Sequence, residues 1–520
     1  MLRQLHSIRR PSPRRFMGTL TQPLVCVIGT TGTGKSQLAV DLALALSQGS
    51  KTAIAPQPWN GGIVINSDAM QVYEGLDIVT NKVTGEEMKG VDHRLLGIRK
   101  PGEEYFVSQW VKDAIMEIDR CHEENKVPII AGGTAYWVQH LIFPNRLVSL
   151  SDSEASEQAQ EASTGVLSSD LAMAISLLPP KLLDLLNHLP DRANADSCPP
   201  ELAFDLHSLL SQLDPSTGSR WHWKDTRKVL RSLEIIRDAG QRASDVMLQQ
   251  DEVAGKPRYP TLIFWLYARS ERLNPRLDDR VDKMVQKGLL HEISTARERA
   301  LGTGVNDRAS RTSPIDYTQG IYQTIGFKEF DEYLSASDPP EKLLQQCLEK
   351  MKHSTRKYAQ RQVKWIQHKL LPAVKSQSDA NTGTSIYLLD ATELESWQEH
   401  VFDEAQDILG DFLNQRPLKD PRGVSESAFE MLGGDVAVLG GAAGVLVSRK
   451  RVICTACTDD PLCPVMIEEG KEWQSHAKSR AHRHRAGRER RIEQQMEARE
   501  EKRRERAMGR AGTPSLANIS

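Results

Sequence analysis

The sequence predicts an α/β fold, in which a parallel sheet is flanked by helices and carries a helical insertion and a small Cys/His module. Short apolar runs alternate with helical patterns over residues 24–145. A glycine-rich turn joins the first of these runs to the first helical pattern. Two cysteines and two histidines towards the end of the chain have the spacing of a tetrahedral metal site. Strands that alternate with helices build βαβ units, and such units give a parallel sheet.

The glycine-rich turn has the pattern of a phosphate loop. Residues 29–36 read Gly-Thr-Thr-Gly-Thr-Gly-Lys-Ser, after an apolar run at 24–28 and before a helical pattern at 37–46. Such a turn presents backbone N–H groups at the positive end of a helix, where anions bind. We therefore expect a P-loop NTPase-like sheet, with Lys35 on the outer phosphates and the Ser36 hydroxyl on Mg²⁺. The predicted phosphate-binding residues are Gly29, Thr30, Thr31, Gly32, Thr33, Gly34, Lys35 and Ser36. A glycine turn without a ligand is the alternative, and the loop alone does not identify the phosphorylated molecule.

Two further segments are expected at the same edge of the sheet. Asp68 follows a strand pattern at 62–66, and ligands bind at the carboxyl ends of parallel strands. An acidic residue there can hold the water of a magnesium ion, or it can take a proton from an attacking amine. Thr134 follows the strand pattern at 127–131 and the glycine pair at 132–133. The alternatives are a plain turn aspartate and a helix-capping threonine.

The Cys/His module has the spacing of a Cys₂His₂ zinc finger. A pair of cysteines separated by two residues is followed, eighteen residues later, by a pair of histidines separated by five. Two thiolates and two imidazoles bind Zn²⁺ tetrahedrally, and the wide histidine spacing is typical of fingers that bind RNA. The predicted ligands are Cys454, Cys457, His476 and His482. His484 and Cys463 are alternative ligands, and cysteines without a metal, followed by a basic tail, are the simpler interpretation.

Seven segments of different character are predicted along the chain. Residues 149–170 are rich in Ser, Glu and Ala and are expected to form a surface insertion. The run at 261–267 is expected to return the chain to the sheet, and 341–370 to form a long, basic, amphipathic helix. The predicted segments are a targeting segment (1–22), the first part of the core (23–147), an insertion with a helical domain (148–260), the completion of the core with basic helices (261–372), a linker of uncertain order (373–450), the zinc finger (451–492) and a charged, disordered tail (493–520).

Composition and charge limit the class of protein. The chain has 520 residues, 39% of them hydrophobic, and a net charge of −2. Residues 471–510 contain fourteen Lys and Arg against seven Glu, which favours a nucleic-acid partner, with a solvated helix as the alternative. Seven scattered cysteines indicate a reducing compartment. The absence of an apolar run of eighteen residues argues against a membrane span.

The N-terminal segment reads as a mitochondrial targeting peptide. Five arginines lie within the first fifteen residues, and no Asp or Glu occurs before Asp41. Met17 could be a second start that removes the segment. We therefore expect two locations, the mitochondrion and the cytoplasm, with the nucleus as a further one.

Motifs over residues 24 to about 370 carry a resemblance to a known family. They are G-T-T-G-T-G-K-S, N-S-D-A-M-Q-V-Y-E-G-L-D-I-V-T-N-K, D-H-R-L-L-G, A-G-G-T-A-Y, R-W-H-W-K-D-T-R-K-V-L-R-S-L-E-I, G-I-Y-Q-T-I-G-F-K-E-F and S-T-R-K-Y-A-Q-R-Q-V-K-W-I. In this order they resemble the tRNA dimethylallyltransferases, or tRNA isopentenyltransferases, of the eukaryotic, fungal-like type. The resemblance implies an enzyme that transfers the dimethylallyl group of dimethylallyl diphosphate to N6 of adenosine 37, in the anticodon stem-loop of tRNA. The products would be N6-isopentenyladenosine and diphosphate.

The resemblance also implies roles for individual residues. Asp68 would be the general base on the adenine amine, and Thr134 would orient the reacting groups and stabilise the bridging oxygen of the leaving diphosphate. The phosphate loop with Mg²⁺ would hold that diphosphate, and the helical domain and zinc finger would bind tRNA. The residues expected to contact tRNA are Asp68, Ala69, Met70, Gln71, Asp225, Arg227, Lys228, Arg231, Arg356, Lys357 and Arg361. The family pattern of Arg276, Asp279 and Arg280 is expected mainly to fix a helix.

Helix 341–370 presents several cations on one face, because positions 357, 361 and 364 are spaced by three and four residues. They could clamp the phosphates of the anticodon stem or line the diphosphate site. A solvated helix face is the alternative.

Three other functions remain alternatives. An adenylate isopentenyltransferase would share the phosphate loop but would not need the helical insertion, the basic helix or the zinc finger. A phosphate-loop kinase or ATPase with an RNA-binding tail would hydrolyse nucleotide or transfer phosphate. A non-catalytic RNA-binding protein would not need Asp68, Lys35 and Thr134 intact. Nothing in the sequence requires more than a monomer.

Overall fold

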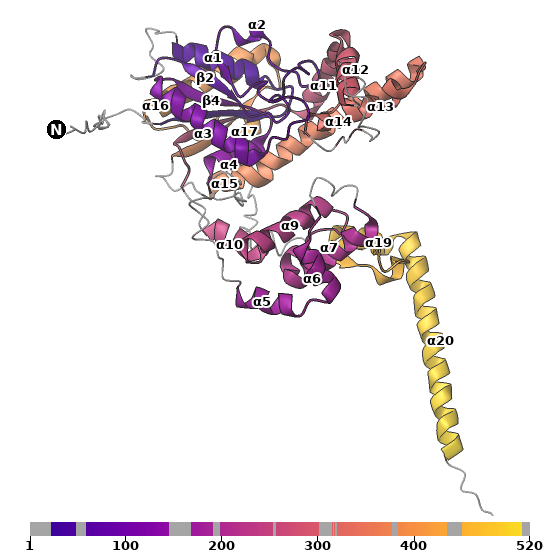
Figure 1. The fold of residues 1–520 in the computed structure, drawn as a ribbon. Coiled ribbons are helices and arrows are strands. Elements are labelled where there is room, and N and C mark those ends of the chain that lie inside the picture. Colours follow the sequence, from indigo (N-terminus) through magenta and orange to yellow (C-terminus); the bar gives the residue numbers. More distant parts are fainter. Residues whose placement is uncertain are drawn as a thin grey trace, which may run out of the picture. The chain divides into compact units, whose positions relative to one another are not determined.

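The computed structural model describes residues 22–47, 59–144, 168–190, 198–252, 256–300, 315, 317, 320–376, 383–433 and 450–511. The chain forms two compact units (Figure 1). The first consists of Met1–Leu147 and Ala254–Val438, and the second of Val148–Val253 and Leu439–Ser520. The expected targeting segment and most of the expected surface insertion lie outside the described residues. Within the described ranges, no helix is both long and apolar enough to cross a membrane.

A six-stranded sheet forms the centre of the first unit, in the order β3-β2-β4-β1-β5-β6. Each neighbouring pair is parallel, as predicted. The strands are β1 (Leu24–Gly29), β2 (Gly62–Asn66), β3 (His93–Arg94), β4 (Val127–Gly132), β5 (Thr261–Tyr267) and β6 (Thr384–Asp390). Because all strands run the same way, the residues that follow β1, β2 and β4 lie at one edge of the sheet.

Helices cover both faces of this sheet (Figure 1). Alternate residues of β1 point to opposite faces, with Cys26 and Ile28 in one apolar cluster and Val25 and Val27 in the other. The first cluster packs against α3 (Val107–Glu123), α4 (Ala135–Ile142), α12 (Leu289–Ala300), α13 (Phe327–Ser335) and α14 (Glu341–Trp365). The second packs against α1 (Lys35–Ser47) and α16 (Glu404–Leu413). The predicted long helix is thus confirmed, and a π-helical turn at Ile366–Leu370 continues it.

The segment predicted as a linker is largely part of the first unit. The helix α15 (Leu371–Lys375) packs on the core, and β6 pairs with β5 from Thr384 to Asp390. The helices α16 and α17 (Glu426–Gly433) follow. The prediction of a linker is therefore wrong for the described residues 373–376 and 383–433, although the sequence does show a strand pattern at 386–389, within β6. The sequence pattern of this segment is weak for two reasons. A π-helical turn, Gln398–Asp403, precedes α16 and interrupts the α-helical period, and the apolar side chains of the segment pack against residues far away in the sequence.

The second unit combines helices with the Cys/His module. Its helices are α5 (Ser169–Ser176), α6 (Pro180–Asn187), α7 (Pro200–Leu213), α8 (Pro215–Gly218), α9 (Thr226–Ala239) and α10 (Ala243–Glu252), around a leucine-rich core. The hairpin of β7 (Arg451–Ile453) and β8 (Met466–Glu468) and the helix α19 (Lys471–Lys478) follow. The buried Trp223 joins the two parts, since its Nε1 donates to the Pro464 carbonyl at 2.9 Å.

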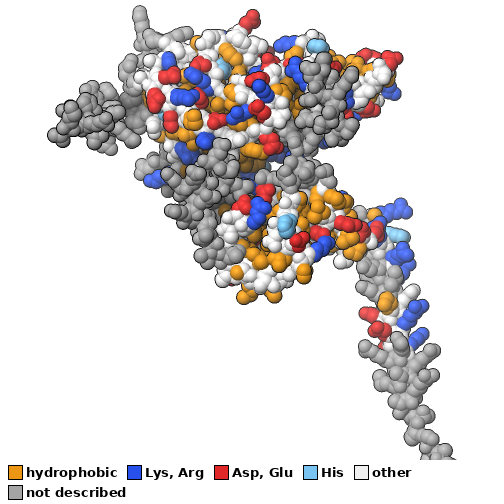
Figure 2. All heavy atoms as spheres, in the orientation of Figure 1, with side chains coloured by type: hydrophobic (Ala, Val, Ile, Leu, Met, Phe, Trp, Pro, Cys, Tyr) orange, Lys and Arg blue, Asp and Glu red, His pale blue; other side chains and the backbone are white. Residues whose placement is uncertain are grey.

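The final helix, α20, runs from Arg480 to Ala511. The prediction of a disordered tail from residue 493 is therefore wrong as far as 511, and residues 512–520 lie outside the described part of the chain. Basic side chains occupy the first turns of this helix, and acidic and basic side chains are mixed farther along its visible part (Figure 2). None of the described side chains of this helix is buried.

Candidate active site

The phosphate loop, residues 29–36, connects β1 to α1 at the carboxyl edge of the sheet. Gly29 has φ +142°, and a Cβ built there would lie 2.2 Å from the Leu266 carbonyl oxygen, so only glycine fits. The Lys35 ammonium donates to the Thr30 carbonyl at 2.7 Å, and the Thr33 hydroxyl donates to the same oxygen at 2.9 Å. The lysine side chain therefore folds back over the loop, at the start of α1, as a phosphate-binding loop requires.

Lys35 lies among other charged side chains. Burial lowers the pKa of Lys35 to about 8; the Asp68 carboxylate opposes this shift, and the Arg280 guanidinium adds to it. Lys35 and Arg280 are thus two cations beside the loop; the Asp68 carboxylate acts on both of them, and the Glu87 carboxylate acts on Arg280. A diphosphate, which is strongly anionic, would be stabilised at this position.

Asp68 is held in a tight turn after β2. Its N–H donates to Asn66 Oδ1 at 3.0 Å, and Asn66 Nδ2 donates to the Asp68 carbonyl at 3.1 Å. Its own Oδ1 accepts from the Met70 N–H at 3.0 Å. The side chain is half-buried, and a Cβ built on Gly133 would lie 3.5 Å from Oδ2. The carboxylate thus has a fixed orientation next to the glycine pair.

Thr134 follows β4, the strand next to β2, and is the N-cap residue of α4. Its hydroxyl accepts from the Ala69 N–H at 3.1 Å, and its N–H donates to the Ser67 carbonyl at 3.3 Å. The structure therefore brings the Asp68 and Thr134 segments together at one edge of the sheet. The phosphate loop shares that edge, because β1 pairs directly with β4.

Gln362 connects two of these segments, a role that charge and periodicity in the sequence do not indicate. From α14, its Oε1 accepts from the Thr31 N–H and its Nε2 donates to the Gly133 carbonyl, both at 3.0 Å. Tyr358, one turn earlier on the same helix, also lies near the site, since burial and the Asp68 carboxylate raise the pKa of its hydroxyl. The basic helix therefore contributes uncharged polar groups to the site, which charge patterning alone could not indicate.

Arg280 is a second residue that contributes to the site more than the sequence pattern indicates. Burial lowers the pKa of Arg280, and the Asp68 carboxylate opposes that shift, so the guanidinium lies near both Asp68 and Lys35. Arg276, one turn earlier on α11 (Ser270–Gln286), fixes that helix as expected, since it donates to the carbonyls of Ala391 and Thr392. The expectation that Arg280 mainly fixes a helix is therefore incomplete.

The predicted metal ligands come together in the second unit. One ligand atom from each of Cys454, Cys457, His476 and His482 lies within 4.8 Å of the others. The Nδ1 of His482 lies 3.4 Å and 3.5 Å from the two sulfur atoms. These separations match the ligand–ligand edge of about 3.5 Å that tetrahedral Zn–S and Zn–N bonds imply. His484 and Cys463 do not belong to this cluster.

The chain is similar to a known protein family and to solved structures. The model of the IPP transferase family matches residues 71–369. The tRNA dimethylallyltransferase of Schizosaccharomyces pombe is 34% identical, over 89% of this chain and 95% of that protein, and the one of Saccharomyces cerevisiae is 32% identical, over 89% and 92%. A crystal structure described as a eukaryotic dimethylallyltransferase acting on tRNA is 30% identical, with a TM-score of 0.68, and covers 92% of this chain and 100% of that one.

The chain belongs to the tRNA dimethylallyltransferase family.

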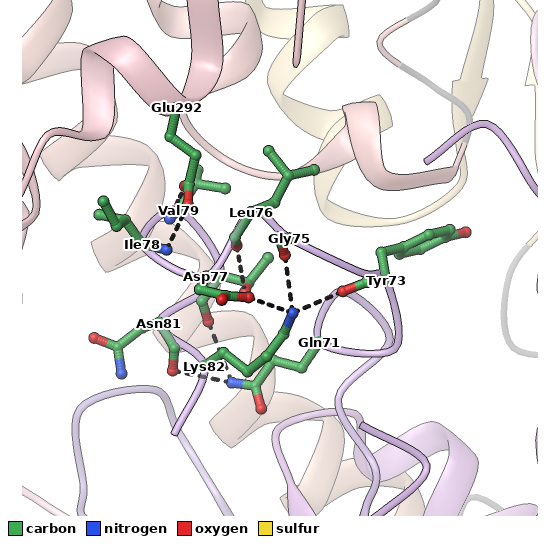
Figure 3. A network of polar contacts seen from close by, with 11 residues as sticks. Gln71, Tyr73, Gly75, Leu76, Asp77, Ile78, Val79, Asn81, Lys82 and Glu292 are labelled. Atoms are coloured by element: carbon green, nitrogen blue, oxygen red, sulfur yellow. Dashed lines mark hydrogen bonds and ion pairs between the residues drawn. The ribbon is translucent and has the colours of Figure 1, made fainter. Parts of the chain in front are cut away.

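In this family member, the loop after Asp68 is fixed by hydrogen bonds within the loop and by two more to Glu292 of α12 (Figure 3). The Lys82 ammonium donates to the carbonyls of Tyr73 and Gly75 at 2.7 and 2.8 Å and to Asp77 Oδ1 at 2.5 Å. The Glu292 carboxylate accepts from the N–H groups of Ile78 and Val79 at 2.9 and 2.8 Å. Gln71, a predicted tRNA contact, donates to the Thr80 and Asn81 carbonyls at 3.2 Å. Its amide nitrogen therefore supports the loop, while Ala69 and Met70 are half-buried beside Asp68.

The basic face of α14 is only partly available to a partner. Arg356 forms an ion pair with Asp278 of α11, so it serves packing between the two helices. Lys357, Arg361 and Lys364 are exposed. The Arg361 guanidinium lies 5.9 Å from the centre of the Tyr358 ring. Figure 2 shows acidic and basic side chains mixed over the visible face of this unit, so any tRNA contact here would depend on individual cations.

The predicted tRNA-binding residues of α9 lie in the second unit. Lys228 is exposed, with its ammonium 3.4 Å from Asp225 Oδ2 and 5.0 Å from the centre of the Trp221 ring. Arg231 lies 3.6 Å from Glu234, and Arg227 is half-buried. The start of α9 and the Trp221 ring before it therefore combine a cation with an aromatic face, a composition that suits RNA binding.

Proposed function

We propose that this chain transfers the dimethylallyl group of dimethylallyl diphosphate to N6 of adenosine 37 in tRNA. One observation carries the proposal. The phosphate loop, the Asp68 carboxylate and the Thr134 turn meet at a single edge of the sheet, where Gln362 connects Thr31 of the loop to Gly133. An anion cradle next to a fixed carboxylate suits a reaction in which a diphosphate leaves while an amine loses a proton.

The reaction would break one C–O bond and form one C–N bond. The allylic C1–O bond ionises as the loop N–H groups, Lys35 and Arg280 stabilise the negative charge on the leaving diphosphate. The N6 nitrogen attacks the allylic carbon, and the Asp68 carboxylate takes the proton that N6 loses. Its fixed Oδ1 keeps the carboxylate in place during this transfer. The amine of adenine is a weak nucleophile, so a nearby proton acceptor assists its attack. The base would leave its stack, because its reacting atom cannot otherwise reach the site.

Two metal ions belong to the proposal. The Ser36 hydroxyl, exposed at the start of α1, is suited to bind Mg²⁺, which would neutralise further charge on the diphosphate. The four-residue Cys/His cluster is suited to bind Zn²⁺ and to add affinity for tRNA. The cations of α9 and the exposed Lys357 and Arg361 of α14 would contact tRNA phosphates.

The N-terminal arginine-rich segment supports import into mitochondria, and a start at Met17 supports a second, cytoplasmic or nuclear product. The chain would act as a monomer. A reporter fused to residues 1–22 should enter mitochondria, and failure of import would refute this part of the proposal.

The direct test uses the purified chain, labelled dimethylallyl diphosphate, Mg²⁺ and a tRNA transcript that carries adenosine 37. Label should enter the RNA and elute as N6-isopentenyladenosine after digestion. A transcript with guanosine at position 37 is the matched control and should stay unlabelled. Release of phosphate from ATP, with no label in RNA, would instead support a kinase or ATPase.

A further inference from the structure

The turn after β6 places an indole ring against the phosphate loop. Trp397 lies between two short helical turns, Leu394–Ser396 (η4) and Gln398–Asp403 (η5). A Cβ built on Gly34 would lie 2.4 Å from Cη2 and 2.7 Å from Cζ3 of this ring. Non-bonded carbon atoms prefer separations of about 3.5–4.0 Å. The six-membered edge of the indole therefore occupies the space beside Gly34, directly before Lys35.

The turn that carries Trp397 is itself attached to α11. Arg276 donates to the Ala391 carbonyl at 2.8 Å, the Arg269 N–H donates to Thr392 Oγ1 at 3.0 Å, and Arg272 Nε donates to Glu393 Oε1 at 3.0 Å. The same helix supports the loop at a second glycine. A Cβ built on Gly32 would lie 2.8 Å from Leu277 Cδ2.

Bulky side chains thus cover the loop at two glycines with left-handed backbone, φ +81° at Gly32 and +84° at Gly34. Glycine reaches this conformation easily but also leaves it easily, so a glycine-rich loop loses much freedom when it binds an anion. A ring packed against Gly34 removes part of that freedom before binding, and preorganisation of this kind raises affinity.

We propose that Trp397 is a positioning residue that holds Gly34, and with it the phosphate loop, in the conformation that binds diphosphate. The inference rests on the proposed function only for the identity of the anion. It assigns a role in the site to a segment that the sequence predicts as a linker.

A purely structural role is the competing explanation, because Trp397 also packs against the apolar cluster of α1 and α16. Trp59 provides a matched control. It is a tryptophan of the same cluster and 5% exposed, but it precedes β2 and so lies at the opposite edge of the sheet. Loss of either indole should lower the melting temperature, and only loss of Trp397 should change the phosphate loop.

The test measures binding of inorganic diphosphate with Mg²⁺, in the absence of tRNA, to the full chain and to Trp397→Ala, Trp397→Phe and Trp59→Ala. We expect Trp397→Ala to weaken binding about tenfold, since preorganisation is lost, and the phenylalanine variant to restore most of it. The KM for dimethylallyl diphosphate should rise in parallel, with kcat and the KM for tRNA little changed. Trp59→Ala should bind diphosphate like the full chain.

Tryptophan emission gives a second readout. Diphosphate should change the emission of the full chain and of Trp59→Phe, and the change should be lost in Trp397→Phe. Wild-type diphosphate affinity in Trp397→Ala, with only a lower melting temperature, would overturn the inference. If that variant does not fold, a diphosphate affinity in Trp397→Leu equal to that of the full chain would overturn it as well. Diphosphate binding that depends on Trp397 without any transfer to tRNA would contradict the proposed function and leave this inference standing.

Discussion

Gln362 accepts a hydrogen bond from the backbone N–H of Thr31 at 3.0 Å, although 331 positions separate the two residues. Its amide nitrogen donates to the Gly133 carbonyl, also at 3.0 Å. One buried side chain from α14 thereby connects the phosphate loop to the turn that holds Thr134. The site is therefore complete only after α14, which lies near the end of the segment that matches the family model (71–369), has folded onto the sheet.

Replacement of Gln362 should damage the site more than the fold. Gln362→Ala removes the partner of the half-buried Thr31 N–H and of the buried Gly133 carbonyl, and a buried group left unpaired costs about 1–3 kcal/mol. We expect a higher KM for dimethylallyl diphosphate and a lower kcat in steady-state transfer assays. Gln360→Ala, at an exposed position of the same helix, is the matched control and should leave both constants unchanged. Equal effects of the two substitutions would contradict the assignment.

Diphosphate affinity should depend on pH through Lys35. With a pKa of about 8, Lys35 is charged below this pH and neutral above it. Diphosphate favours the charged form, so its affinity should fall as the pH rises above 8, by up to roughly tenfold per unit. Calorimetric titration over pH 7–10 measures this slope. The Lys35→Gln variant reports the ionisation of diphosphate alone, and an identical profile for both proteins would show that Lys35 does not titrate at the site.

Removal of the metal should loosen the second unit. The Cys454 N–H donates to the Val465 carbonyl at 2.8 Å, and the adjacent Pro464 carbonyl accepts from Trp223, two residues before Asp225. Chelation, or Cys454→Ser, should therefore shift tryptophan emission and weaken tRNA binding in filter-binding assays. Diphosphate affinity should not change, because the phosphate loop belongs to the other unit. Cys463→Ser, which alters a cysteine outside the cluster, should retain zinc and tRNA affinity; the same loss in both variants would argue against the assigned ligands.

Lys228 should contribute to tRNA affinity mainly through charge. Its ammonium is exposed beside the Trp221 ring, so Lys228→Gln should lower the slope of log affinity against log salt by about one phosphate contact. The rate of transfer at saturating tRNA should stay the same. Lys181→Gln removes another exposed lysine of the same unit, one paired with Asp205 at 2.6 Å. An unchanged salt slope in Lys228→Gln would place this lysine outside the interface.

Local patterns predicted the parts of the site that are contiguous in sequence. The phosphate loop, Asp68 and Thr134 each follow a strand, and parallel pairing alone brings the ends of β1, β2 and β4 to one edge. The four residues of the Cys/His cluster are also recognisable, because a metal site requires fixed residue types at short spacings. In the structure, the alternative ligands Cys463 and His484 lie outside the cluster of these four residues.

The parts that were missed depend on distant contacts. Gln362, Arg280 and Trp397 lie on different elements, and each acquires its role only where α14, α11 or the turn after β6 packs beside the loop. Neither charge nor periodicity distinguishes a buried glutamine in a basic helix from an exposed one. The apolar run at 386–389 has a strand pattern in the sequence, but only its pairing with β5 shows that this strand belongs to the sheet and not to a linker.

The most direct measurement of the central claim compares the full chain with Asp68→Asn. Asparagine keeps an oxygen for the Met70 N–H, so the turn should persist while the proton acceptor is lost. Nucleosides of tRNA incubated with each protein and dimethylallyl diphosphate are quantified by mass spectrometry under single-turnover conditions. The account predicts N6-isopentenyladenosine with the full chain and formation slower by on the order of 10²–10⁴-fold with Asp68→Asn, at nearly unchanged diphosphate affinity. Formation at the same rate by both proteins, or by neither, would contradict it.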